Sequence, residues 1–175
     1  MTDQTNSDDR HLILGIDPGS LCTGYGIVSA SGRRLECVDF GAIHLASKLP
    51  FHERLQILGN RLQTILAAYP IRVMALESVF FSKNAQSSLK LGHVRGVALY
   101  IGASAGLDIY EYSPASVKMA LAGYGRAIKD QVQFMVQHML HLKTSPQPAD
   151  ASDALAVAIC HANSIRLHQR TKKPV

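Results

Sequence analysis

Apolar positions repeat along this chain with two different periods, one typical of strands and the other typical of helices. Near the N-terminus, the apolar run Leu12–Ile16 ends on Asp17, and a turn at Pro18-Gly19 leads into a second apolar run. Between Phe51 and Tyr69, leucines and isoleucines recur every three or four residues, which is the spacing of one helix face. The same criteria predict the remaining elements.

The predicted strands are Leu12–Asp17, Thr23–Ser29, Leu35–Ile43, Ile71–Glu77 and Leu107–Tyr112. The predicted helices are Phe51–Tyr69, Asn84–Ser104, Ser113–Ala122, Lys129–Leu142 and Ala149–His168, with Asn84 as an N-cap. Three strands in succession favour an antiparallel meander, and the later alternation of strand and helix favours an α/β domain with a five-stranded mixed sheet flanked by helices. We expect one domain over residues 11–168, a flexible tail over 1–10 and a polar tail over 169–175.

Composition supports a folded, globular chain, because 47% of its 175 residues are hydrophobic and 18% are charged. No apolar stretch reaches the roughly 20 residues of a membrane-spanning helix. The polar, acidic start "MTDQTNSDDR" is unlike an ordinary signal peptide, and three scattered cysteines suit a reducing compartment. We therefore expect a cytoplasmic protein with no membrane partner.

The net charge is +5 and the pI is about 9.2. Such a charge fits either a mildly basic enzyme surface or a polyanionic partner such as nucleic acid. The total charge leaves both interpretations open, so the placement of individual charged residues must decide between them.

Four acidic residues are placed where they could form one site. Asp17 and Glu77 each end a predicted strand, and if these two strands are parallel neighbours their acids lie side by side at one sheet edge. Asp150 and Asp153 are three residues apart, so they share one face in the first turn of the last predicted helix. That helix could lean on the sheet and point both side chains at Asp17 and Glu77.

Each acid also has an ordinary explanation when it is taken alone. An Asp-Pro-Gly turn is common, and Asp150 and Asp153 could be an N-cap and a first-turn acid favoured by the helix dipole. Together, however, like charges repel unless a cation neutralises them. Hard oxygen ligands without nearby His or Cys favour Mg²⁺ or Mn²⁺, and two ions about 3.5–4 Å apart could assist hydrolysis of a phosphodiester.

Four segments, in this order, resemble the RuvC-type Holliday-junction resolvases. They are "GIDPGSLCTGYGIV", "ALESVFFSKNAQSSLKLGHVRGVAL", "YSPASVKMALAGYGRAIKDQVQFMV" and "ADASDALAVAICHA", and together they cover the chain from His11 to about His161. The resemblance implies a ribonuclease-H-like fold and a homodimer that nicks two opposing strands of a four-way DNA junction. It also implies that the catalytic metal ligands, with Mg²⁺ as the metal, are Asp17, Glu77, Asp150 and Asp153.

The same resemblance implies roles for an aromatic residue and two lysines. Phe80 would stack on an unpaired base, although it could instead be a packing aromatic. Lys118 and Lys129 would bind phosphates near the active site, although each could be an ordinary solvated lysine. His138 and His141, three apart on a predicted helix, are interpreted as surface residues, and His161 as a packing residue.

The expected partners also follow from the resemblance. They are a junction-binding protein and a hexameric branch-migration motor, of the RuvA and RuvB types. A two-fold dimer suits the near two-fold symmetry of the junction. The predicted helix Asn84–Ser104, with Gly92, Gly96 and Ala103, is the candidate interface, although it could instead pack only on its own sheet.

Three other functions share part of this pattern. "GIDPGS" is also similar to the phosphate-binding turn of actin-like ATPases and sugar kinases, but those folds enclose a nucleotide between two domains. A non-catalytic junction-binding module would not need the four acids. A ribonuclease acting on RNA–DNA hybrids would use the same fold and chemistry, and only the resemblance separates it from a resolvase.

Overall fold

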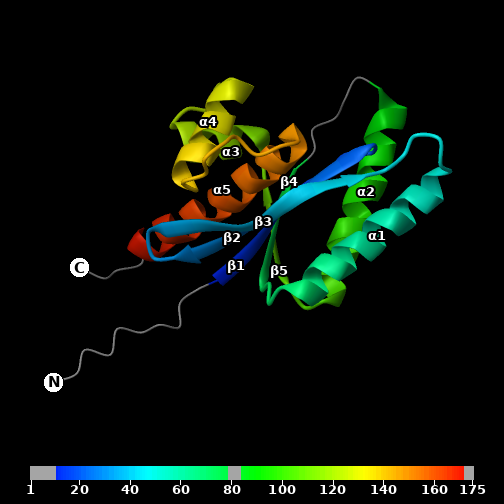
Figure 1. Ribbon diagram of the computed structural model, residues 1–175, viewed down its shortest axis with the longest axis horizontal. Coiled ribbons are helices and arrows are strands. Elements are labelled where there is room, and N and C mark those ends of the chain that lie inside the picture. Colours follow the sequence, from blue (N-terminus) through cyan, green and yellow to red (C-terminus); the bar gives the residue numbers. More distant parts are fainter. Residues whose placement is uncertain (1–10, 79–83, 172–175) are drawn as a thin grey trace.

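A computed structural model describes residues 11–78 and 84–171 of the chain, with side chains as far as Arg166. Its elements in chain order are β1 (His11–Asp17), β2 (Cys22–Ser31), β3 (Arg34–His44), α1 (Phe51–Ala68), β4 (Val73–Glu77), α2 (Ala85–Ser104), β5 (Asp108–Tyr112), α3 (Pro114–Ala122), α4 (Lys129–Met139) and α5 (Ala149–Thr171). Figure 1 shows the sheet between two layers of helices. The predicted tail over residues 1–10 and the last residues of the predicted C-terminal tail lie outside the described part.

The sheet has the strand order β3-β2-β1-β4-β5. β1, β2 and β3 pair antiparallel as the predicted meander, whereas β4 pairs parallel to β1 and β5 parallel to β4. The register places Ile16 opposite Leu76, so the acids that follow them, Asp17 and Glu77, end neighbouring strands at the same edge. This topology confirms the predicted α/β fold with a five-stranded mixed sheet.

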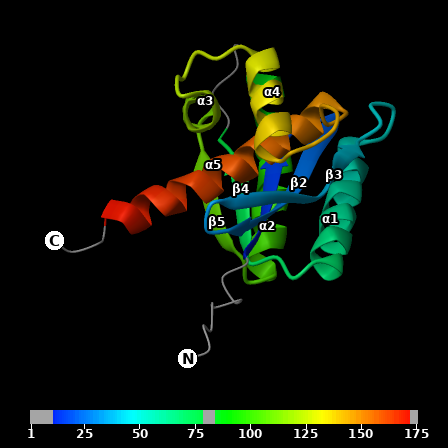
Figure 2. The same ribbon diagram turned by 60° about the vertical axis from the view of Figure 1, so that its left-hand side comes forward.

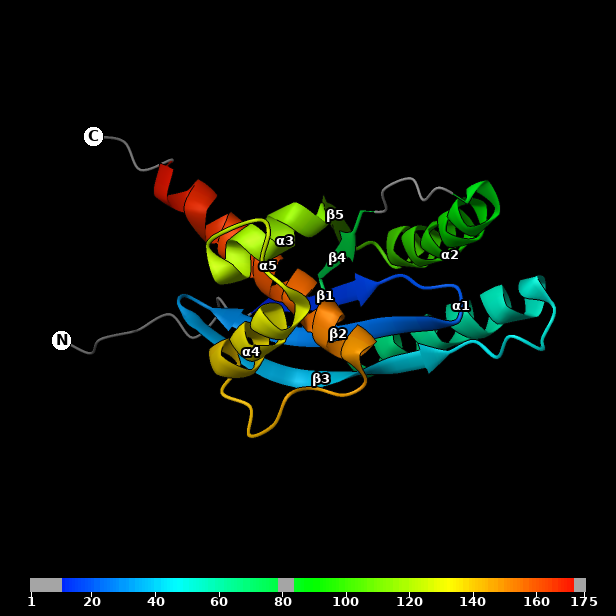
Figure 3. The same ribbon diagram turned by 90° about the horizontal axis from the view of Figure 1, so that it is seen from above.

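Two hydrophobic cores lie on opposite faces of the sheet. One face is covered by α1 and α2, which pack Leu58, Leu62 and Val94 against the strands. The other is covered by α3, α4 and α5, and Figure 3 shows α3 and α4 on either side of α5. Because helices cover both faces, the ends of the central strands β1 and β4 are the part of the sheet where polar side chains can lie close to the core.

Helix α5 crosses the strands obliquely and packs directly on their backbone (Figure 2). Gly15 of β1 and Gly26 of β2 are cross-strand partners, and Gly24 lies two residues before Gly26 on the same strand face. A Cβ added at Gly15 would lie 2.0 Å from the carbonyl oxygen of Ala154, and one at Gly24 would lie 1.9 Å from that of Asp150. Any side chain at these glycines would therefore hold the start of α5 away from the sheet.

Most predicted boundaries agree with the structure to within one or two residues. The Asn84 side chain caps α2 by accepting hydrogen bonds from the backbone N–H groups of Gln86 and Ser87. Ser113 caps α3 in the same way. Both caps supply acceptors for N–H groups that have no partner within the helix.

Three boundaries are worth comparing with the prediction. Helix α5 continues to Thr171 rather than ending at His168, so part of the predicted polar tail is helical. β4 begins at Val73 rather than Ile71, because the Ile71 N–H donates to the Tyr69 carbonyl in the turn after α1. α4 ends at Met139 rather than Leu142, because His141 has a φ of 52° and so leaves the right-handed helical conformation. His141 therefore lies beyond the helix that carries His138.

Composition predicted that the chain has no membrane-spanning helix and that its cysteines suit a reducing compartment. Within residues 11–78 and 84–171, no helix is both long and apolar enough to cross a membrane. The cysteines Cys22, Cys37 and Cys160 are free thiols.

We predict that Gly24→Ala damages the active-site end of the fold. The added methyl group overlaps the Asp150 carbonyl, so α5 must shift, and overpacking of this kind costs about 1–3 kcal/mol. The free energy of unfolding, measured with urea, should fall by that amount, and cleavage activity should fall with it.

Gly59→Ala on α1 is the matched control for this variant. Its added Cβ would meet only ordinary contacts, with Val97 Cγ1 at 3.6 Å, and alanine stabilises a helix interior relative to glycine by up to about 1 kcal/mol. Equal stability and activity of Gly24→Ala and Gly59→Ala would contradict the close packing of α5.

Candidate active site

The turn after Asp17 is braced from two sides. The Thr23 hydroxyl donates to the Gly19 carbonyl at 3.0 Å and accepts from the Gly19 N–H at 3.3 Å. From α1, Arg54 Nη1 donates to the Ser20 carbonyl at 3.0 Å. These contacts fix the backbone on which Asp17 stands, while the turn leads the chain away from the sheet edge.

Arg54 is a positioning residue that the sequence analysis missed. Its side chain is buried, and its guanidinium lies 5.0 Å from the centre of the Phe51 ring. The available signal was its spacing, since Arg54 stands four and eight residues before Leu58 and Leu62 on the buried face of α1. An arginine in that position must find a polar partner inside the fold, and it finds the turn after Asp17.

The four predicted acids come together around Asp17. The pKa of Asp17 is raised to about 8, first by burial and then by the negative charges of Glu77, Asp153 and Asp150, in that order. The pKa of Glu77 is also raised, first by burial and then by the charge of Asp153. Because β1, β4 and α5 each contribute to this cluster, the fold holds like charges together against their repulsion.

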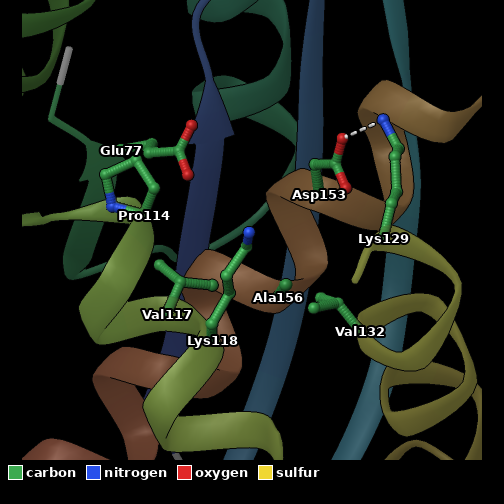
Figure 4. A pocket seen from close by; sticks show the side chains of 8 residues that line it. All are labelled: Glu77, Pro114, Val117, Lys118, Lys129, Val132, Asp153 and Ala156. Carbon is green, nitrogen blue, oxygen red and sulfur yellow. Dashed lines mark hydrogen bonds and ion pairs between the residues drawn. The ribbon is translucent and has the colours of Figure 1, made fainter. Parts of the chain in front are cut away.

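Two lysines balance part of this negative charge. A pocket of about 200 Å³ is lined by Glu77 and Asp153 and by Lys118 from α3 and Lys129 from α4. Figure 4 shows Lys118 pointing into the space between the two acids, and Lys129 Nζ lies 2.8 Å from Asp153 Oδ2. A hydrogen bond to Asp153 is the main cause of a raised pKa at Lys129. The predicted basic residues thus reach the acids from a separate pair of helices.

Asp150 is oriented differently from Asp153. It does not line the pocket, and its carboxylate lies close enough to the Cys22 thiol at the start of β2 to raise the pKa of that thiol. Burial is the main cause that raises the pKa of the Cys22 thiol to about 11, so the thiol is protonated and can donate to Asp150. The sequence analysis did not anticipate this contact, which links the first turn of α5 to the turn after Asp17.

The donor chemistry at this edge fits a hard divalent cation. Carboxylate oxygens are the ligands that Mg²⁺ and Mn²⁺ prefer, and a cation would relieve the repulsion that raises the pKa of Asp17. With the side chains as they stand, the described residues contain no group of three His, Cys, Asp or Glu side chains in metal-binding geometry. One reason is that Asp153 is turned toward the Lys129 ammonium, so rotation of acidic side chains would have to accompany binding.

The other predicted residues are placed as follows. Phe80 lies outside the described residues. His138 and His141 are exposed, as predicted for surface residues. His161 is fully buried, and its Nδ1 lies 2.8 Å from the Tyr112 hydroxyl, so it is the packing residue that was expected.

Comparison with known proteins identifies the family. The family model described as crossover junction endodeoxyribonuclease RuvC matches residues 13–161. The chain is 53% identical to the enzyme of that name from Geobacter sulfurreducens, over 87% of this chain and 92% of the relative. It is 45% identical to the one from Ruminiclostridium cellulolyticum, over 89% of this chain and 94% of the relative.

The chain belongs to the RuvC family of crossover junction endodeoxyribonucleases.

A solved member of the RuvC family has the same fold. The structure of Thermus thermophilus RuvC in complex with a Holliday junction substrate superimposes with a TM-score of 0.86 at 32% identity, covering 90% of this chain and 96% of that chain. The ribonuclease-H-like fold class is therefore confirmed.

Membership of the RuvC family decides between the functions that the sequence left open. RuvC enzymes are metal-dependent nucleases that hydrolyse DNA phosphodiester bonds. The predicted endodeoxyribonuclease activity is confirmed, and the alternatives of a nucleotide-binding ATPase or kinase and of a non-catalytic module are wrong.

We predict that Asp17 makes the metal-free protein less stable as the pH rises. Its carboxyl has a pKa of about 8 in the folded protein, against the ordinary aspartate pKa of 3.8 expected in the unfolded chain. Between those values the folded state binds more protons at Asp17 than the unfolded state does, so this contribution lowers stability with rising pH. Asp17→Asn should remove it and raise the Tm at pH 8 by several degrees, since about 1 kcal/mol moves the Tm by roughly 2–4 °C in a chain of this size.

Calorimetry in EDTA across this pH range would measure the effect. Burial lowers the pKa of His161 to about 4, which acts in the opposite direction, but this contribution is common to both proteins and cancels in the difference. Glu36→Gln, on β3 away from the four acids and from His161, serves as the control and should follow the wild-type profile. Parallel profiles for wild type and Asp17→Asn would contradict the raised pKa.

Proposed function

We propose that this chain resolves four-way (Holliday) DNA junctions by paired symmetric nicks during homologous recombination and DNA repair. The observation that carries the proposal is the clustering of four acids, from β1, β4 and α5, beside two lysines from α3 and α4. The likeness to Thermus thermophilus RuvC, whose structure contains a Holliday junction substrate, supports the junction as the substrate.

The proposed metal ligands are Asp17, Glu77, Asp150 and Asp153, with Mg²⁺ as the ion, Mn²⁺ as a substitute and two ions in each site. Bound there, such ions supply Lewis-acid stabilisation to an attacking water and to the leaving oxygen of the phosphodiester. The protein contributes a rigid edge, because Asp17 and Glu77 stand on paired strands and α5 is held on the strand backbone.

The lysines are proposed to hold the DNA backbone. Lys118 and Lys129 place ammonium groups in the same pocket as Glu77 and Asp153, where a phosphate between the acids and the lysines would be neutralised. Phe80 remains a prediction, as a ring that stacks on an unpaired base near the scissile phosphate.

A homodimer is proposed through the outer face of α2. Leu89 and Tyr100 are 64% and 70% exposed on that helix, and the space around Gly92 and Gly96 is open. The spacing of these residues places them on one stripe, whereas Val94 and Ala98 face the chain's own sheet. An exposed apolar stripe with two glycines allows close approach of a second α2, and a two-fold pair would present one site to each of two opposing strands.

The remaining proposals rest on the family. They are one nuclease domain over residues 11–168 with polar tails, cytoplasmic location, and cooperation with RuvA- and RuvB-type proteins.

We predict that Asp17→Asn binds a junction as tightly as the wild type but cleaves it at least about 100-fold more slowly. Loss of a single group that stabilises transition-state charge costs roughly 10²–10³ in rate. Purified protein should be incubated in Mg²⁺ or Ca²⁺ with a labelled synthetic junction, a linear duplex and an RNA–DNA hybrid. Symmetric paired nicks in the junction alone, dependent on Mg²⁺ and on Asp17, are expected.

Asp108→Asn should cleave at the wild-type rate, since Asp108 begins β5 at the far end of the sheet. Cleavage of the hybrid in place of the junction would overturn the substrate, and near-normal nicking by Asp17→Asn would overturn the site.

We predict that Tyr100→Arg shifts the protein from dimer to monomer, because it places a charge in the exposed stripe of α2. Sedimentation velocity would measure the mass, and a cruciform plasmid would report whether the two nicks are still made in one binding event. Phe134→Arg, at an equally exposed aromatic on α4, is the control and should remain a dimer. A wild-type protein that sediments as a monomer at micromolar concentration would refute the interface.

A further inference from the structure

The two helices that carry the site's lysines are joined by a short linker, residues 123–128. The linker leaves α3 through Gly123, whose φ of 80° few other residues adopt, and it reaches Lys129 through Ile128, which is 62% exposed. Ile128 therefore has little packing to hold it, although Lys129, the residue after it, must meet Asp153. Ala127, just before Ile128, is buried in the core and anchors the linker, but the backbone at Ile128 itself needs a contact other than hydrophobic packing.

Gln131 supplies that contact from within the first turn of α4. Its Oε1 atom accepts a hydrogen bond from the Ile128 N–H at 3.1 Å and another from the Tyr124 hydroxyl at 2.5 Å. One side-chain oxygen thus joins the beginning of the linker, the residue before Lys129 and the helix itself. The Ile128 side chain has no polar atom with which to cap the helix, so this contact stands in for a cap.

The two hydrogen bonds that Gln131 accepts, from Ile128 and Tyr124, form a clamp next to Lys129, which lines the pocket. Lys129 is the first residue of α4, and its ammonium lies 2.8 Å from Asp153 although its side chain is 57% exposed. One turn further on, Val132 is buried and lines the same pocket. With Val132 packed and Ile128 clamped, the backbone of Lys129 is held on both sides.

We infer that Gln131 and Tyr124 are positioning residues that hold Lys129 in the geometry needed for cleavage. They act through Lys129. Among the hydrogen bonds of the described residues, neither Gln131 nor Tyr124 contacts any of the four acids. The inference rests on the proposed function, because it assumes that Lys129 binds the DNA backbone at the reacting phosphate. Neither side chain belongs to the hydrophobic core, which leaves stability little affected by their conservative replacement.

The test uses Gln131→Met, which keeps length and helix propensity but removes the acceptor, and Tyr124→Phe, which removes only the hydroxyl. Single-turnover cleavage of a junction should slow by roughly 5- to 50-fold in each, because a 1 Å misplacement can cost about 100-fold. Junction affinity should change less than about twofold. Gln131→Glu retains an acceptor oxygen and should recover most of the rate.

Gln137→Met is the matched control on the same helix, since Gln137 donates to the Lys143 carbonyl away from the pocket. It should cleave at the wild-type rate.

A double-mutant cycle separates positioning from a merely structural role. In a Lys129→Met background, Gln131→Met should have no further effect on the cleavage rate, because the group it positions is gone. An equal slowing in both backgrounds, or a loss of junction affinity with an unchanged cleavage rate, would overturn the inference.

A measurement without DNA distinguishes failure of the positioning role of Gln131 from failure of the proposed function. The ammonium NMR signal of Lys129 should report its ion pair with Asp153 in the wild type and in Gln131→Glu, and lose it in Gln131→Met. If the wild type cleaves no junction, the proposed function fails. The NMR comparison then decides the clamp alone, and an unchanged ammonium signal in Gln131→Met would overturn it.

Discussion

The direct contact between α5 and the backbone of β1 and β2 is the constraint on which the active site depends. At Gly15 and Gly24, carbonyl oxygens of α5 occupy the space that a Cβ would need, at 2.0 and 1.9 Å from its ideal position. A helix ordinarily packs on a sheet through side chains, which would keep its first turn several ångströms further out. Here glycines without side chains let α5 approach the strands, so that the carboxylates of Asp150 and Asp153 lie close to the Asp17 carboxyl group.

Such closeness has an electrostatic consequence. Three negative side chains raise the pKa of a buried Asp17, so the fold brings together groups that would separate if packing did not hold them. Sites that violate the ordinary rules of stability in this way are usually functional, and the compensation lies elsewhere in the structure. Part of it is the pair of lysines, and part is the large apolar interface of α5, where Leu155 and Ile159 are fully buried.

The acids and the antiparallel meander of β1, β2 and β3 could be predicted because they depend on local patterns. The parallel pairing of β1 with β4 was only a condition of the predicted site, and the structure supplies it. A strand that ends on an acid can be recognised in the sequence, and parallel neighbours then place Asp17 and Glu77 at one edge. The support for the site could not be predicted, because it depends on tertiary distances. The pairing of Gly15 with Gly26 and the reach of Arg54 to Ser20 appear only when strands and helices are in register. The end of α4 was missed because nothing in its apolar spacing signals a positive φ at His141.

The four acids and the two lysines of the site stand on different kinds of support, and this affects how easily each group can change its partner. The acids stand on strands or on a helix packed against strand backbone, so their positions change little without unfolding the core. The lysines stand on two short helices joined by a linker, and the exposed end of that linker donates a hydrogen bond from the Ile128 N–H to Gln131 Oε1. A partly exposed lysine on such a support can exchange Asp153 for a phosphate at small cost, because exposed ion pairs contribute only about 0–1 kcal/mol. The fold thus separates acids on a rigid support from lysines on an adjustable one, so that the lysines can turn to a phosphate while the backbone that carries the acids stays in place.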